Sequence, residues 1–189
     1  NLNQQDKILN QLQRKAMKLR MLPMKTEFNK LPRIVRDISR EQEKDIDLTI
    51  EGGETEIDKS VLDSLHGPLV HLIRNAVDHG IESPEERRAA GKSETGHVDI
   101  RAYQESGHVY VEIEDDGAGI PVDVIEEKAI ERGVIDENHD LEDEEIQRLI
   151  FESGFSTTEE VTDVSGRGVG MEVVVREIEN LRGSIHIDS

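Results

Sequence analysis

Four short segments of the sequence alternate between apolar and polar residues, and this alternation restricts the fold more than any other feature. They are residues 46–51 (IDLTIE), 97–103 (HVDIRAY), 108–114 (HVYVEIE) and 184–188 (SIHID). A period of two predicts β-strands that bury one face and expose the other. The connection QESG between the second and third segments contains glycine, so these two strands should form an antiparallel hairpin.

Segments with apolar residues at helical intervals separate the strands. Helices are expected at 58–79, 121–132, 142–151 and 169–182, and an amphipathic helix at about 27–43. A sheet that buries one face needs helices on one side only, so we expect a layer of helices on one face of a sheet. Because the sequence stops inside or just after a strand, we expect it to be a fragment of a longer protein.

The N-terminal segment has the spacing of a bundle helix. Leu2, Leu9 and Ala16 occupy one heptad position, and Leu12 and Leu19 occupy another. This pattern predicts a helix that associates with another helix, although a helix packed on its own domain is the alternative. Pro23 should end it.

Composition excludes several classes of function. The 189 residues contain no cysteine, which excludes disulfides and thiol chemistry. The net charge is −19, and residues 112–160 hold eighteen acidic against three basic residues, so general nucleic-acid binding is not expected. No run of eighteen apolar residues suits a membrane span, and we expect a soluble, cytoplasmic protein without direct membrane insertion.

Residues 66–80, HGPLVHLIRNAVDHG, predict a mostly apolar helix that also carries polar side chains. Residues four apart share a helix face, so His71, Asn75 and His79 should form one column, with Asp78 beside it. Gly80 follows as a helix stop. A solvated face would carry Lys and Glu, so the column should line a site; structural histidines are the alternative, and a zinc pair would need further ligands.

Two glycine motifs follow. EDDGAGI (residues 114–120) places a carboxylate at a strand end, where its acceptor-only oxygens suit a donor such as the exocyclic amine of adenine. SGRGVGMEVV (residues 165–174) leads glycine-rich backbone into a helix N-terminus, which is suited to phosphate. An acidic turn and a flexible hinge are the respective alternatives.

Between the motifs lies FESGFSTTEEVTDV (residues 151–164), whose composition predicts a mobile lid rather than core. Ser156 and Thr157 are hydroxyl donors that could close over a terminal phosphate. Either residue could equally belong to an ordinary surface loop.

In this order, the motifs resemble the GHKL ATP-binding fold, which is shared by histidine kinases, gyrase, MutL and heat-shock chaperone ATPases. The chain is most similar to the CheA family of chemotaxis histidine kinases. HLIRNAVDHGIESPEERRAAGK, EDDGAGI, GFST and VSGRGVGMEVV read like its N, G1, F and G2 boxes, and LPRIVRDISRE resembles the helix that leads into its catalytic domain.

The resemblance implies a fold and a domain organisation. The fold would be an α/β two-layer sandwich of the Bergerat type, with a mixed, mostly antiparallel sheet covered by helices on one face. Residues 1–22 would be the end of a dimerisation helix with its linker. Residues 23–189 would be the ATP-binding kinase domain, with a lid at about 121–165 and its C-terminal strands missing.

The resemblance also implies roles for individual residues. Asn75 would hold Mg²⁺ through its amide oxygen, His79 and Asp78 would lie in the ATP site, and His71 would be the general base. Asp115 would read adenine. Gly117, Gly119 and Ile120 would form the pocket wall, and Lys128, Ser156, Thr157, Gly166, Arg167, Gly168, Val169, Gly170 and Met171 would contact phosphates. Thr158 departs from relatives that have a lid lysine.

The implied activity is transfer of the γ-phosphoryl group of Mg²⁺-ATP to a histidine on a separate phosphotransfer domain. The implied partners are response regulators, a coupling protein and chemoreceptors, and the full protein would be a homodimer. Two alternatives stay open: a GHKL ATPase that drives a conformational change, and a non-catalytic dimerisation or signalling module.

Overall fold

The computed structural model describes residues 6–9, 11, 15, 18–152, 155 and 170–189. The chain divides into two compact units, Asn1–Asp115 and Asp116–Ser189.

The first unit contains a three-stranded sheet. Its strands are β2 (Ile46–Glu51), β4 (Gly96–Glu105) and β5 (His108–Asp115), in the order β2-β4-β5. β2 pairs with β4 in parallel, and β4 pairs with β5 antiparallel. Three of the four predicted strands and the predicted hairpin are therefore confirmed, and the sheet is mixed.

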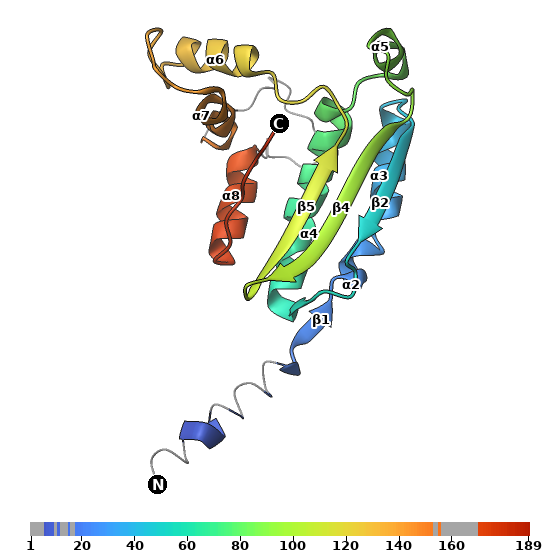
Figure 1. Ribbon diagram of the computed structural model, residues 1–189, viewed down its shortest axis with the longest axis vertical. Coiled ribbons are helices and arrows are strands. Elements are labelled where there is room, and N and C mark those ends of the chain that lie inside the picture. Colours follow the sequence, from blue (N-terminus) through green and yellow to red (C-terminus); the bar gives the residue numbers. More distant parts are fainter. Residues whose placement is uncertain (1–5, 10, 12–14, 16–17, 153–154, 156–169) are drawn as a thin grey trace. The chain divides into compact units, whose positions relative to one another are not determined.

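One face of this sheet is covered by helices. Along β4, Val98, Ile100 and Ala102 are buried, whereas the residues between them are exposed. Figure 1 shows α3 (Leu31–Glu41) and α4 (Lys59–Asn75) on one side of the sheet. The predicted arrangement, a layer of helices on one face, is confirmed.

The helix expected at about 27–43 is shorter and preceded by a break. A single turn, α2 (Lys25–Phe28), is followed by α3, which begins at Leu31. Pro32 explains the difference, because proline lacks a backbone N–H and fits only the first turn of a helix. A helix running from residue 27 would have placed Pro32 in its interior.

The helix expected at 58–79 forms, but its last turn differs. Asp58 caps α4 by accepting a hydrogen bond from the Ser60 N–H at 2.8 Å. The α-helix ends at Asn75, and Ala76–Gly80 forms one π turn. A π turn holds more residues than an α turn, so a spacing of four no longer aligns side chains beyond Asn75.

Three elements of the first unit were not predicted. β1 (Met21–Pro23) and β3 (Glu56–Asp58) form a small antiparallel sheet. Helix α5 (Pro84–Ala89) begins with a capping box between Ser83 and Glu86. The sequence Ser-Pro-Glu-Glu carried this signal, because a capping residue three positions before glutamate, with proline between them, typically starts a helix.

The second unit contains α6 (Val122–Glu131), α7 (Asp143–Arg148), a 3-10 turn (Leu149–Phe151) and α8 (Met171–Asn180). These elements match the predicted helices, apart from residue 169, which lies outside the described residues. Ile125, Ala129, Ile146 and Phe155 form the core of this unit.

The strand predicted at 184–188 is wrong. These residues form no regular element, although Ile185 and Ile187 are half-buried and His186 is exposed. A strand needs a partner for its backbone hydrogen bonds, and the described part of the second unit contains none. The side chains at 185–187 thus alternate between half-buried and exposed, although this segment pairs with no strand among the described residues.

The N-terminal helix is described only in part. Residues 6–9, 11, 15 and 18 are helical, and Ile8, Leu9 and Leu19 are exposed large apolar residues. The helix stops before the strand β1 rather than at Pro23. The division at residue 22 and dimerisation through this helix stay predictions. Within the described residues, no helix is both long and apolar enough to cross a membrane.

Candidate functional site

The end of α4 and the π turn present the predicted polar side chains. His71 and Asn75 are half-buried on α4, whereas His79 in the π turn is exposed. Asp78 exposes 17% of its side chain. The predicted column is therefore half-buried over His71 and Asn75, with His79 more open to solvent.

Asp115 lies on the covered face of the sheet. It is the last residue of β5 and is directly opposite Val98 of β4, which is buried. Residues directly opposite in an antiparallel pair point to the same face. The strand thus ends with a carboxylate on the face that otherwise carries Ile113 and Val111 opposite buried residues of β4.

Gly80 brings the π turn against this carboxylate. A Cβ atom added to Gly80 would lie 2.9 Å from Asp115 Oδ1 and 3.0 Å from Oδ2. Only glycine allows this approach without displacing the carboxylate. The sequence predicts Gly80 only as a helix stop and gives no signal of its position beside Asp115.

Asp78 is held in an unfavourable setting for its charge. Its Oδ1 atom is buried and accepts no hydrogen bond from the described residues. Its Oδ2 atom lies 3.8 Å from Arg74 Nη1. Burial raises the pKa of the Asp78 carboxyl above its ordinary value, and the nearby Arg74 cation only partly offsets this.

This raised pKa predicts a pH dependence of stability. The folded protein binds the Asp78 proton more tightly than the unfolded chain does, so Asp78 favours folding most below its ordinary pKa and loses this advantage as pH rises through the raised value. We expect the free energy of unfolding of the wild type, relative to Asp78→Asn, to fall as pH rises from acid to neutral. Urea unfolding of both proteins across this range measures it, and a constant difference would contradict it.

Several predicted residues belong to the second unit. Gly119 adopts a φ of 76°, and the Ile120 N–H donates to Ser189 Oγ at 2.8 Å. Gly119 and Ile120 line a hollow of about 360 Å³ with Ala118, Val122, Asp143, Glu144, Gln147, Asp188 and Ser189. Three carboxylates in this lining disfavour an anionic ligand there. Lys128 is half-buried on α6, and Gly117 precedes that helix.

The predicted phosphate segment is described only at its end. Gly170 precedes the first residue of α8, Met171. A Cβ atom on Gly170 would lie 2.0 Å from Glu172 Oε2, so this carboxylate lies against the glycine. Ser156, Thr157, Gly166, Arg167, Gly168 and Val169 lie outside the described residues, as does Thr158. The roles proposed for all residues of the second unit stay predictions.

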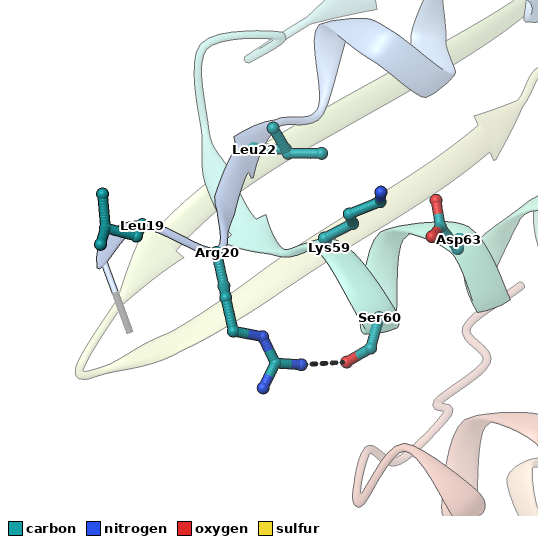
Figure 2. Close-up of a pocket in the computed structure, with 6 residues that line it drawn as sticks. All are labelled: Leu19, Arg20, Leu22, Lys59, Ser60 and Asp63. Carbon is teal, nitrogen blue, oxygen red and sulfur yellow. Dashed lines mark hydrogen bonds between the residues drawn. The ribbon is translucent and has the colours of Figure 1, made fainter. Parts of the chain in front are cut away.

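A separate hollow lies at the start of α4. Its volume is about 260 Å³. Figure 2 shows its lining residues, Leu19, Arg20, Leu22, Lys59, Ser60 and Asp63. Arg20 donates to Ser60 Oγ at 3.4 Å and to Asp58 Oδ1 at 3.2 Å. Since this lining includes none of the residues predicted to bind nucleotide, we do not place the functional site here.

Comparison with known families decides the assignment. Residues 63–189 match the family described as histidine kinase-, DNA gyrase B- and HSP90-like ATPase. The chain belongs to this ATPase family. The matched range includes most of α4, the π turn and Asp115, and the GHKL-type fold class is confirmed.

Individual relatives are consistent with this family. The chain is 48% identical over 190 residues to "Chemotaxis protein CheA" of Halobacterium salinarum, covering 100% of this chain and 28% of the relative. It is 49% identical to "Chemotaxis protein CheA" of Bacillus subtilis, covering 97% and 28%. It is 53% identical to "Sensor histidine kinase CheAY" of Helicobacter pylori, covering 94% and 22%.

The chain therefore spans about a quarter of the length of these relatives. Among solved structures, it is similar to the histidine kinase domain from Erythrobacter litoralis EL346 blue-light activated histidine kinase. That similarity has a TM-score of 0.39 and 22% identity, and covers 54% of this chain and 45% of the other.

Proposed function

We propose that the chain is the ATP-binding domain of a chemotaxis histidine kinase, which binds Mg²⁺-ATP and directs the γ-phosphoryl group to a histidine on a separate domain. The observation that carries this proposal is the carboxylate of Asp115 on the covered face of the sheet, set against the backbone of Gly80. It occurs in a chain that belongs to an ATPase family.

Asp115 would recognise adenine. An ionised carboxylate only accepts hydrogen bonds, and the exocyclic amine of adenine only donates them here. The neighbouring residues of β5 on this face are apolar, which suits the flat surface of a base. Gly80 lets the backbone of the π turn approach the carboxylate closely because it has no side chain.

Asn75 would contribute to the Mg²⁺ site. Mg²⁺ favours oxygen ligands and usually keeps several waters while binding phosphates, so a single amide oxygen from the protein is sufficient. Among the described residues, no group of three His, Asp or Glu side chains could hold a metal by itself. A cation is needed in any case, because a chain of net charge −19 repels a triphosphate.

His71 would act as the general base. Bound ATP supplies the phosphoryl group, and Mg²⁺ neutralises charge on its oxygens. As the acceptor nitrogen bonds to the γ-phosphorus, the bond from phosphorus to the bridging oxygen breaks and ADP leaves. The acceptor proton would pass to the imidazole of His71, whose ordinary pKa is near neutrality. His71 is half-buried one helical turn before Asn75.

The partners follow from the proposed activity. The acceptor would be a phosphotransfer domain outside this chain, from which the phosphoryl group passes to response regulators. A coupling protein and chemoreceptors would set the activity of a cytoplasmic homodimer. The relatives, which bear chemotaxis names, support this proposal.

The two alternatives make different demands on the site. An ATPase would need a base that activates water, and its turnover would not depend on an acceptor domain. A non-catalytic module would need no nucleotide. The Asp115–Gly80 arrangement supports nucleotide binding and so disfavours the second alternative, whereas the first requires a transfer measurement.

Calorimetric titration tests nucleotide binding. Wild-type protein should bind ATP in the presence of Mg²⁺, and removal of Mg²⁺ should weaken binding of ATP far more than binding of adenosine, because only ATP carries the phosphates. Equal Mg²⁺ dependence for the two ligands would contradict the assigned role of the cation. Absence of any ATP binding would contradict the function itself.

Gly80→Ala should separate affinity from stability. The added methyl group overlaps the end of the Asp115 side chain, which can rotate away, so the thermal midpoint should change little. Rotation removes the adenine contact, so ATP affinity should fall about tenfold or more. Gly53→Ala is the matched control, because its Cβ would meet Lys25 only at 3.4 Å. Unchanged ATP affinity in Gly80→Ala would contradict the placement of adenine at Asp115.

A further inference from the structure

Two backbone carbonyls in the π turn after α4 need hydrogen-bond donors from outside the helix. The Ile81 N–H donates to Ala76 O at 2.8 Å, which closes the turn. The carbonyls of Val77 and Asp78 lie in the last turn, where a helix has no further N–H groups to offer them. Short π turns inside helices are rare and frequently occur at functional sites.

Lys44 supplies the missing donor. Its Nζ donates to Val77 O at 2.7 Å and to Asp78 O at 2.8 Å. The side chain comes from the connection between α3 and β2, where the Lys44 N–H donates to Ser39 O at 2.9 Å. A cation at the C-terminal end of a helix is also favoured by the helix dipole.

The same turn carries the side chains and the backbone that form the proposed site. Asp78 and His79 belong to it, and Asn75 immediately precedes it. Gly80 closes it and lies against the Asp115 carboxylate. Movement of the turn would therefore alter the approach of Gly80 to Asp115 and the presentation of Asn75 together.

We propose that Lys44 is a positioning residue for the nucleotide site: its ammonium group holds the π turn so that Gly80 stays against Asp115. This inference rests on the proposed function. Lys44 acts through two backbone carbonyls and belongs to none of the sequence motifs. Groups that orient the residues contacting a ligand commonly matter nearly as much as those residues themselves.

The role differs from direct contact with phosphate. A lysine that touched the phosphates would matter for ATP and not for adenosine. A lysine that holds Gly80 against Asp115 affects the adenine end, so its loss should weaken the binding of adenosine as well as that of ATP.

The experiment compares Lys44→Met with Lys44→Arg and with Lys30→Met. Lys30 is the matched control, because its Nζ also makes a 2.7 Å contact with a buried partner, Glu27, in the same unit. Two quantities are measured below the unfolding temperature of each protein: amide hydrogen exchange of Ile81 without nucleotide, and calorimetric affinity for adenosine and for ATP with Mg²⁺.

Lys44→Met should exchange the Ile81 amide at least about tenfold faster than Lys30→Met does, and should bind both ligands about tenfold more weakly than wild type. Lys44→Arg, which keeps a cation with several donors, should recover most of both losses. Unchanged affinity in Lys44→Met, or a loss confined to ATP, would overturn the inference while leaving the proposed function intact. If the wild type binds no ATP, the proposed function fails. Unchanged exchange of the Ile81 amide in Lys44→Met would separately show that Lys44 does not stabilise the π turn.

Discussion

His71→Gln should bind ATP about as tightly as the wild type but transfer phosphate at least about a hundredfold more slowly, since general base catalysis typically contributes about 10²–10⁴-fold to rate. Glutamine keeps a polar side chain of similar reach on α4 but cannot accept the acceptor proton. Single-turnover transfer to an acceptor domain, with ATP affinity measured in parallel, checks both parts of the prediction.

Two further variants make the result specific. His66→Gln removes another imidazole from the same helix, where it pairs with Glu27 instead, and should transfer at nearly the wild-type rate. Asn75→Ala should weaken Mg²⁺-nucleotide binding and transfer together, because it would remove a metal ligand. If His71→Gln transfers normally, His71 is structural and the acceptor loses its proton without this imidazole.

Asp115→Asn should weaken ATP binding by roughly tenfold to more than a hundredfold while leaving the fold intact, because a hydrogen bond to a charged group is worth about 1.5–3 kcal/mol. The change preserves shape but replaces one acceptor oxygen with an NH₂ group that faces the adenine amine. Titration calorimetry measures the affinity, and thermal unfolding checks the fold.

Glu114→Gln is the matched control for this variant. It removes the same charge one residue earlier on β5, but Glu114 is opposite the exposed residue Asp99 and points to the uncovered face. We expect its ATP affinity to stay close to that of the wild type. Equal affinity of Asp115→Asn and wild type would remove Asp115 from adenine recognition.

The strands were the most predictable part of the fold. Apolar and polar residues alternate along them because one face of the sheet is buried and the other is exposed. In β4, buried and exposed residues alternate from Gly96 to Ala102. The segment 184–188 shows the limit of this signal. Alternation indicates that a segment can form a strand, whereas pairing depends on a partner that the segment itself does not encode.

Two helix starts are set by local sequence signals, a proline and a capping box. Pro32 fixes the start of α3, and the capping box at Ser83 starts α5, so both could have been predicted from the sequence. The π turn after Asn75 could not, because the helical spacing of the apolar residues continues through it without a break.

The sequence predicts candidate residues for the site but not the contacts that hold them in place. A polar column in an apolar helix and a carboxylate before glycines identified Asn75 and Asp115 as candidates. Lys44 stands in no motif, and its contact with Val77 and Asp78 spans 33 and 34 residues of sequence. Long-range contacts between a side chain and the backbone leave no periodic or compositional signal in the sequence.

Transfer of radiolabel from ATP to a separate acceptor tests the central claim most directly. The chain is incubated with Mg²⁺, a CheA-type phosphotransfer domain and ATP labelled at either the γ- or the α-phosphate. The account predicts that only γ-label reaches the acceptor, as acid-labile, base-stable phosphohistidine, and that no label is transferred without this chain. Release of free phosphate at a rate independent of the acceptor, with the acceptor unlabelled, would contradict the kinase assignment and favour an ATPase.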